Sequence, residues 1–244
     1  MVKSFSAMKH PRYITEVIEY WLNFESLCKR HCLFSESYMV YPIGQYLREM
    51  YGDKISAEYP HPILKTVKTG VGDKPRIDFV VLGDKINKED ERPIEFALEN
   101  KWCSENATTI ENIIKDIIRL ELIAYNYNAS CYFILAGKNK HLKILFKNKK
   151  FTGNDNTDVL LSLTENSSTI LKLNPAPSLR NTTIKNALEP FSNLDIANSI
   201  KITSLRKYIS ENSEDEKVSV YGWRIKKRKH IKRFKPEDVF YYSK

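Results

Sequence analysis

The chain has 244 residues, 42% of them hydrophobic, which suits one sizeable packed domain or a domain with an extension and excludes a disordered chain. No apolar run approaches the ~20 residues of a membrane helix, and Met1–Phe5 lacks the apolar block of a secretion signal. The formal net charge is +9, and four cysteines are too few for a disulfide framework. We therefore expect a cytoplasmic protein with reduced thiols, no membrane contact and a polyanion as partner.

Two helices are predicted at the start of the chain. Ile14 to Arg30 is a helical stretch, and Ser35 opens a second, amphipathic run through Ile43 and Leu47. Glu36, at the start of that run, has two readings. It is either an accessory acid of a functional site, or an acid that favours the positive end of the helix dipole whatever the function.

Three strand-like segments follow, Lys54 to Pro60, Pro75 to Leu82 and Pro93 to Trp102. Apolar residues alternate around Asp78 in the second segment and alternate with Glu95 and Glu99 in the third, which is the pattern of strands with one buried face. The two acids Asp78 and Glu99 thus leave the apolar face. If the two strands pair as a hairpin, these acids converge, and Lys101 projects on the same side as Glu99.

Two clustered carboxylates with a lysine form a site for a hard cation. A magnesium ion held by Asp78 and Glu99 would bind phosphate oxygens and lower the pKa of a bound water, while Lys101 would stabilise the developing charge. This pattern predicts phosphodiester hydrolysis. The alternative is that these are ordinary surface residues that share a strand face by chance. Glu58 and Glu95 are further acids that either touch the site or are simply solvated.

A long helix and a further strand follow the third strand. Thr108 to Tyr125 carries isoleucine and leucine at helical spacing, so one stripe should pack on the sheet. Lys115, Asp116 and Arg119 lie on the other faces, where we expect a solvated surface. Ala129 to Gly137 is the fourth predicted strand.

Residues 1–150 are therefore predicted to form a core with a helical lead-in, and residues 151–244 a β-rich elaboration, either packed on the core or forming a small appended domain. Leu142, Leu145 and Phe146 predict an amphipathic helix at the junction. Beyond it, the predicted strands are Val159 to Leu163, Ile170 to Leu173, and a terminal hairpin of Ile200 to Ile209 with Val218 to Ile225.

A basic segment accounts for nearly all the net charge. Its eight cations are Arg224, Lys226, Lys227, Arg228, Lys229, Lys232, Arg233 and Lys235, and no acid lies among them. Such a patch suits sequence-independent binding to the phosphates of nucleic acid, and such binding weakens steeply with salt. The alternative is a solubilising tail. Tyr221, Trp223, Tyr241 and Tyr242 either stack on bases or pack in the fold.

From Ser35 to Gly137 the chain resembles the PD-(D/E)xK nuclease superfamily. The resemblance rests on the order of elements and on Asp78 followed by the Glu99-Asn100-Lys101 motif. It implies a mixed α/β, restriction-endonuclease-like core, with a central mixed sheet of four to five strands flanked by helices. One departure is that Ile77, rather than a proline, precedes Asp78.

The resemblance also implies roles for individual residues. Asp78 and Glu99 would bind Mg²⁺, with Mn²⁺ as a substitute, and the backbone carbonyl of Asn100 would add a ligand. Lys101 would serve the attacking water and the transition state, and Glu36 would be an accessory acid. A second similarity, to family helices reading Lys-Asp-x-x-Arg-Leu, would place residues 115–120 at an edge of the site.

The sequence thus predicts a Mg²⁺-dependent endonuclease that cleaves DNA, in a restriction, defence or mobile-element context. RNA stays an alternative substrate. A second hypothesis is a non-catalytic nucleic-acid-binding module or subunit that keeps the nuclease fold. The sequence leaves open whether the protein acts as a homodimer or within a larger complex.

Overall fold

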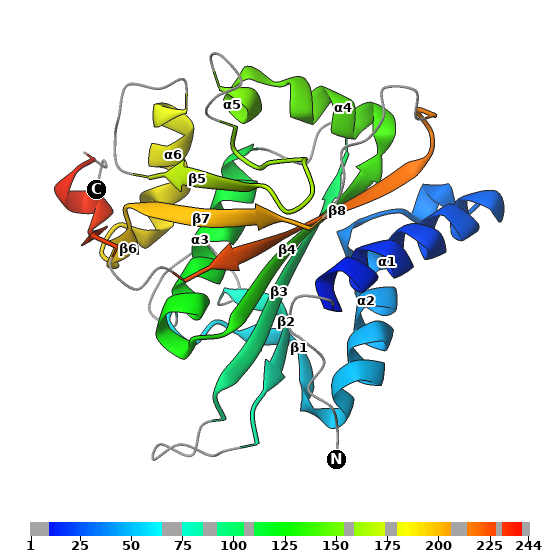
Figure 1. The fold of residues 1–244 in the computed structure, drawn as a ribbon, viewed down its shortest axis with the longest axis horizontal. Coiled ribbons are helices and arrows are strands. Elements are labelled where there is room, and N and C mark those ends of the chain that lie inside the picture. The colour runs from blue at the N-terminus through cyan, green and yellow to red at the C-terminus, as the bar shows by residue number, and fades with distance from the viewer. Residues whose placement is uncertain are drawn as a thin grey trace.

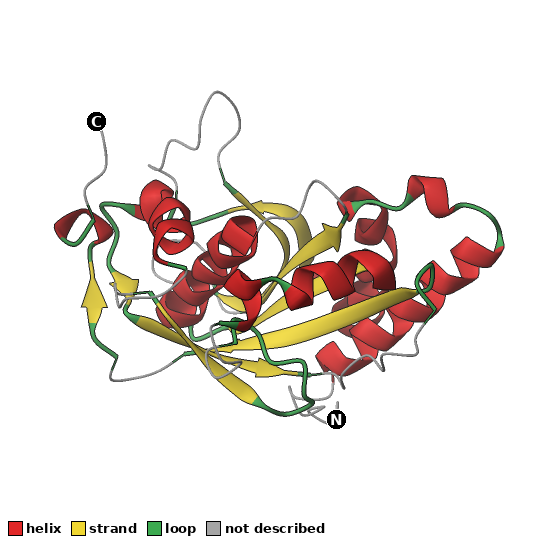
Figure 2. Cartoon of the chain, turned by 90° about the horizontal axis from the view of Figure 1, so that it is seen from above, coloured by secondary structure: helices red, strands yellow, loops and turns green. Residues whose placement is uncertain are grey.

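The protein is built on a seven-stranded mixed sheet with helices on both faces (Figure 1, Figure 2). The computed structural model describes residues 10–64, 75–84, 92–104, 110–153, 159–173, 180–205, 214–227 and 231–240, with the side chains of residues 10–12 excepted. The strand order is β1-β2-β3-β4-β8-β7-β5. Mixed α/β architecture is therefore confirmed, but the expected four to five strands are wrong, because three strands of the C-terminal part join the sheet.

The first four strands follow the predicted order. They are β1 (Ile55–Pro60), β2 (Arg76–Leu82), β3 (Ile94–Cys103) and β4 (Ser130–Lys138). The first three pair as an antiparallel meander, and helix α3 (Ile110–Tyr127) then leads to β4, which runs parallel to β3. The first two residues of that predicted helix, Thr108 and Thr109, lie outside the described residues.

Two apolar cores lie on opposite faces of the sheet. Helices α1 (His10–Leu27) and α2 (Glu36–Tyr51) cover one face with residues such as Ile18 and Ile43, and α3 covers the other with its isoleucine stripe. Ser35 caps α2 by accepting a hydrogen bond from the backbone N–H of Tyr38 at 3.2 Å, which confirms the predicted helix start. The central strand β3 is thus buried on both faces, so the expectation of one buried face is wrong for it.

The C-terminal part continues the same sheet. Its elements are α4 (Asn139–Lys147), α5 (Lys149–Thr152), β5 (Ser168–Lys172), α6 (Asn181–Leu188), β7 (Ser199–Ser204) and β8 (Val218–Lys226), with a small second sheet of β6 (Ile196–Ala197) and β9 (Arg233–Phe234). Within the described segments, 3₁₀ turns span His31–Leu33, Gly52–Lys54, Glu189–Phe191 and Pro236–Asp238. Strand β8 pairs antiparallel with β4 from Val218 to Ile225. None of the described helices is long and apolar enough to span a membrane.

Two predictions for this part have different outcomes. The hairpin is confirmed, since β7 pairs antiparallel with β8, although much of its acidic connection lies outside the described residues. The strand predicted at Val159 to Leu163 is wrong. Leu160 and Leu161 are fully buried there, but in a bend, so the apolar run fills the core without pairing.

Side chains of α1 close an open edge of β8. Within the described residues, strand β7 pairs with the second half of β8, from Trp223 to Lys226, and the backbone of Val218 and Val220 is bonded by side chains of α1. The amide of Asn23 donates to the Val218 carbonyl at 2.9 Å and accepts from its N–H at 3.1 Å. Glu19 accepts from the Val220 N–H at 2.8 Å. Helix α1 therefore takes the place of a neighbouring strand.

Replacing Asn23 should destabilise the fold. We expect Asn23→Ala to lower the free energy of unfolding by roughly 1–3 kcal/mol, because a backbone N–H and a carbonyl of β8 lose their partner. Urea unfolding measures the change. The matched control is Asn126→Ala, which should cost less, because the Asn126 amide donates to a carbonyl of its own helix, Leu122 at 2.8 Å, rather than to a strand. Equal losses in both variants would contradict this role.

Candidate active site

The strand register brings Asp78 and Glu99 together, as predicted. Val80 pairs with Ala97 and Phe79 with Leu98, and the same register continued by one residue sets Asp78 opposite Glu99. Asp78 does not stand free, because its Oδ2 accepts a hydrogen bond of 2.7 Å from the backbone N–H of Asn100. This bond fixes the carboxylate against β3 at the start of the Glu-Asn-Lys motif.

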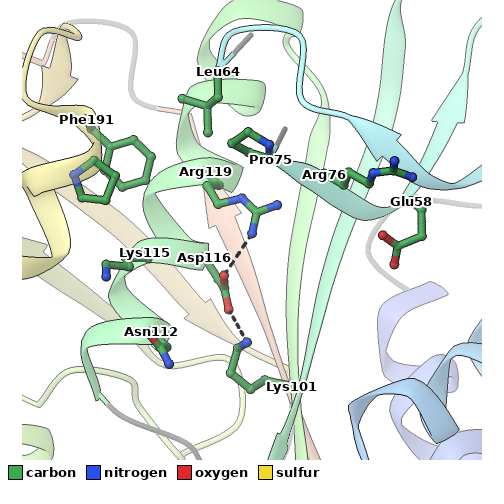
Figure 3. Close-up of a pocket in the computed structure, with 11 residues that line it drawn as sticks. Glu58, Leu64, Pro75, Arg76, Lys101, Asn112, Lys115, Asp116, Arg119 and Phe191 are labelled. Atoms are coloured by element: carbon green, nitrogen blue, oxygen red, sulfur yellow. Dashed lines mark hydrogen bonds and ion pairs between the residues drawn. The ribbon is translucent and has the colours of Figure 1, made fainter. Parts of the chain in front are cut away.

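Lys101 links the sheet to both flanking helices. Its Nζ lies 3.2 Å from Asp116 Oδ2 on α3 (Figure 3). The same Nζ lies 3.3 Å from Glu36 Oε2, at the first residue of α2. Glu36 begins the helix, as one reading of the sequence expects, and it also contacts Lys101. Its role as an accessory acid stays a prediction. Held between two acids, the ammonium group is oriented before any substrate arrives.

Arg119 is the second cation of the site. Its guanidinium lies 3.0 Å from Glu99 Oε1 and 3.4 Å from Asp116 Oδ1. Asp116 is only 6% exposed, so the expected solvated face of α3 is wrong at this turn. Residues three apart share a helix face, and the face of Asp116 and Arg119 meets the charged end of β3 rather than water. The Lys-Asp-x-x-Arg-Leu similarity was the signal that pointed to this placement.

Burial shifts the protonation of the acids. Glu99 is 3% exposed, and loss of water raises its pKa well above the ordinary value despite the charge of Arg119. Burial likewise raises the pKa of Asp78 to about 7, against the hydrogen bond from Asn100, with the charges of Glu36 and Asp116 adding to the rise. Such strongly perturbed carboxylates are typical of functional sites.

Neighbouring acids keep Lys101 and Arg119 charged in spite of burial. Burial lowers the pKa of Lys101, but the charges of Asp116 and Glu36 more than offset this, and the net shift is upward. Arg119 behaves in the same way through Glu99 and Asp116. The site thus places two protonated cations beside carboxyl groups whose pKa values are raised by burial. The positive charge of Arg119 favours the ionised form of these carboxyl groups.

The donor set fits a hard cation with water ligands. Among the described residues no group of three or more His, Cys, Asp or Glu converges as a metal set. Asp78 and Glu99 nonetheless supply two carboxylates, and Glu99 Oε1 is fully buried without a well-directed hydrogen bond in the described structure, although Arg119 lies near it. Mg²⁺ usually keeps several waters and needs only one or two carboxylates. Two carboxylates are thus present for such an ion, and Mg²⁺ binding stays a prediction.

A cation-lined pocket of about 530 Å³ adjoins this cluster (Figure 3). Its positive side chains are Arg76, Lys101, Lys115 and Arg119. The turn Glu189–Phe191 supplies Pro190 and Phe191 to the wall, so the C-terminal part helps to shape the pocket. Four cations around one cavity favour an anionic ligand such as a phosphate.

The two further acids have different positions. Glu58 lines the pocket, with a positive φ of 49° that turns the backbone at this point of β1. Glu95 is exposed near the other end of β3, beside Gly83, where an added Cβ would lie 2.8 Å from Glu95 Oε1. Glu58 is therefore brought to the candidate site and Glu95 is not.

The basic segment is divided by the structure. Lys232 and Lys235 are exposed, whereas Arg228 and Lys229 lie outside the described residues. Arg233 donates to both carboxylate oxygens of Glu121, at 2.8 and 3.1 Å, and its guanidinium lies 3.9 Å from the ring centroid of Tyr125. Arg233 therefore belongs to the packing of the fold rather than to the predicted nucleic-acid contacts.

The other members of the segment lie near or on β8. Lys227 Nζ stands 5.7 Å from the ring centroid of Tyr125. Arg224 lies across from Tyr132, on the sheet face opposite the candidate site, and Lys226 shares that face. Tyr221 and Trp223 are fully buried, which confirms packing rather than base stacking, and the described residues do not include Tyr241 or Tyr242.

No protein-family model, curated protein or solved structure matches the chain. The geometry of the chain's own residues therefore carries the functional argument.

Removing the charge of Asp78 should stabilise the protein at high pH. A carboxyl whose pKa rises from 3.8 unfolded to about 7 folded binds more protons when folded, so stability falls as pH rises through this window. In EDTA at pH 8 we expect Asp78→Asn to raise the free energy of unfolding by roughly 1–4 kcal/mol. Urea unfolding from pH 4 to 8 tests this. The gain should vanish near pH 4, and a pH-independent difference would contradict it.

Removing Arg119 should have the opposite effect. Arg119→Met leaves Glu99 buried without its cation, which should cost roughly 3–5 kcal/mol of stability at pH 8. A second change, Glu99→Gln, should restore most of the loss, because the uncompensated charge is then gone. The double-mutant cycle measures this coupling by urea unfolding. Strictly additive changes would show that the two side chains do not interact.

Proposed function

We propose that the protein is a metal-dependent nuclease that hydrolyses phosphodiester bonds, with DNA as substrate. The observation that carries the proposal is the juxtaposition of Asp78 and Glu99 on neighbouring strands, with Lys101 beside a pocket lined by cations. Both acids have raised pKa values, chiefly through burial, and the lysine is held by Glu36 and Asp116.

Each residue has a chemical task in this proposal. When bound by Asp78, Glu99 and the Asn100 carbonyl, Mg²⁺ or Mn²⁺ would supply charge stabilisation and a water of lowered pKa. Lys101 donates from its fixed ammonium group to the attacking water or to a phosphate oxygen. Arg76 and Lys115 bind the neighbouring phosphate oxygens in the pocket.

Arg119 has a particular position in this scheme. It contacts Glu99 and Asp116 and also lines the pocket, so one guanidinium faces both the carboxylates and the space for the substrate. Five N–H donors allow it to keep a carboxylate contact while it donates to a phosphate. We assign it to substrate binding and to the neutralisation of Glu99.

The arrangement of elements supports a restriction-endonuclease-like core. Helix α2, the meander β1-β2-β3, helix α3 and the parallel strand β4 occur in the order expected from the resemblance. The proposed core would then be extended by β8, β7 and β5. One such site cuts one strand, so cleavage of a duplex would be served by a symmetric pair of chains.

A nucleic-acid-binding module without catalysis is the second candidate. The observation that favours it is that Glu99 and Asp116 already have cation partners in the chain, Arg119 and Lys101, as in a purely structural ion-pair network. Such a module would bind nucleic acid in the pocket but would need no metal.

Cleavage of supercoiled plasmid in Mg²⁺ tests the proposal. We expect Asp78→Asn to abolish nicking, and Lys101→Met to lower its rate by roughly 10²–10³-fold, because each removes charge stabilisation at the phosphate. Glu95→Gln is the matched control and should retain activity, since Glu95 lies away from the site. Cleavage that survives both site changes would exclude this mechanism.

Calorimetry separates the two candidates. A nuclease should bind Mg²⁺ or Mn²⁺, and Asp78→Asn should lose that binding. A binding module should show no such metal site, yet should still bind DNA. Parallel assays with single-stranded RNA decide between the substrate classes.

A further inference from the structure

A second basic surface lies on the sheet face opposite the candidate site. Strands β5, β7 and β8 turn their apolar residues, such as Ile202 and Trp223, toward α3 and its neighbours. Their other face carries Ser168, Ile170 and Lys172 from β5, Ser199, Lys201 and Thr203 from β7, and Arg224 and Lys226 from β8. All eight side chains are exposed or half-buried.

Helices α1 and α2 leave this face open. The chain of α1 crosses β8 at Gly222, where an added Cβ would lie 2.8 Å from Thr15 Cγ2. Arg224 and Lys226 lie beyond that crossing. In Figure 1, α1 and α2 lie to the right of β5, β7 and the C-terminal end of β8. The face is therefore a surface in the described structure.

Charges on this face repel one another. Lys201 stands directly across from Lys226, and Arg224 stands across from the neighbouring Thr203. Like charges directly opposite on neighbouring strands destabilise a sheet. Burial, then Arg224 and Lys201, lower the pKa of Lys226, as expected of cations that lie close together. Among the described strand residues that share this face, none is acidic. The fold itself gains nothing from this arrangement.

We propose that Lys172, Lys201, Arg224 and Lys226, the basic sheet face, bind the phosphate backbone of nucleic acid as an anchor apart from the candidate site. Phosphates would remove the repulsion between these cations and release counterions. The hydroxyls of Ser168 and Thr203, which bond each other at 2.9 Å, add donors between the charges. Among the eight described side chains of this open face, Ile170 alone is apolar, so an apolar partner fits the face poorly.

A short nucleic acid cannot contact the basic sheet face and the candidate active site at the same time, because they lie on opposite faces of the sheet. Glu99 lies across from Phe133, which in turn pairs with Trp223, and these three share the α3 face, whereas Arg224 is on the other face. A nucleic acid must be long enough to pass around the sheet to meet both. The anchor would thus raise the local concentration of long substrates. That the basic sheet face binds a polyanion follows from its own charges. That this polyanion is a nucleic acid rests on the proposed function.

Binding by a cleavage-deficient protein tests the anchor. In an Asp78→Asn background without Mg²⁺, we expect Lys201→Glu with Lys226→Glu to weaken binding to a 200-base-pair duplex by at least about 10-fold at low salt and to lower the salt slope by about 2. The matched control is Lys147→Glu with Lys149→Glu, which makes the same change in net charge at exposed residues of α4 and α5. Equal loss in the control would overturn the anchor.

A second measurement keeps the test independent of folding and of the proposed chemistry. With Asp78 intact, the variant Lys201→Gln with Lys226→Gln should raise KM for long DNA and leave kcat unchanged, and a 12-base-pair substrate should be cleaved as by the unaltered protein. Unchanged binding and KM would overturn the anchor even if Asp78-dependent cleavage is found. Anchor-dependent binding without any cleavage would overturn the nuclease and support the anchor. The proposal would also be overturned if the Lys201→Gln with Lys226→Gln variant lost binding to phosphatidylserine vesicles but bound DNA as the unaltered protein does.

Discussion

The ion pairs between β3 and α3 are the interaction on which the rest of the site depends. Arg119 lies between Glu99 and Asp116, and Lys101 joins Asp116 to Glu36 on α2. Strand β3 and helix α3 are thus joined by charges that are largely buried, and the exposed Glu36 adds a contact from α2. Each charge is tolerated only because its partner is present. Because buried acids need cation partners, the ion pairs that stabilise the fold also place Lys101 and Arg119 beside the acids of the candidate site.

Alternation was sufficient to predict the central pair of the candidate site, because Asp78 and Glu99 interrupt apolar strands that pair as neighbours. It could not predict Asp116 and Arg119, because a helical stripe shows which face is apolar but not whether a neighbouring polar face meets water or another charge. The pairing of β8 with β4 could not be predicted from the sequence either, because the two strands are separated in the chain by most of the C-terminal part. Burial of Arg233 on Glu121 depends on that same long-range arrangement.

The C-terminal part is thereby integral to the candidate site and not only attached to it. Phe191 forms part of the pocket wall, and Trp223 packs on Phe133 at a centroid distance of 5.9 Å, behind the strand that borders β3. Without β8, the buried residues of β4 would lose their cover on one side. The structure also shows that cations of the basic segment occupy different environments. Arg233 packs against Glu121, whereas Arg224 lies on an open face of the sheet.

The closure of β8 by α1 has a consequence for the behaviour of the chain in a cell. An unpaired strand edge is a template for another chain, and folded proteins avoid association by covering or charging such edges. Here the cover consists of two side chains, Asn23 and Glu19, so it forms only after α1 has docked. A chain in which α1 detaches would expose an apolar strand edge in the middle of its sheet. Docking of the first helix would then protect the protein against aggregation as well as completing its core.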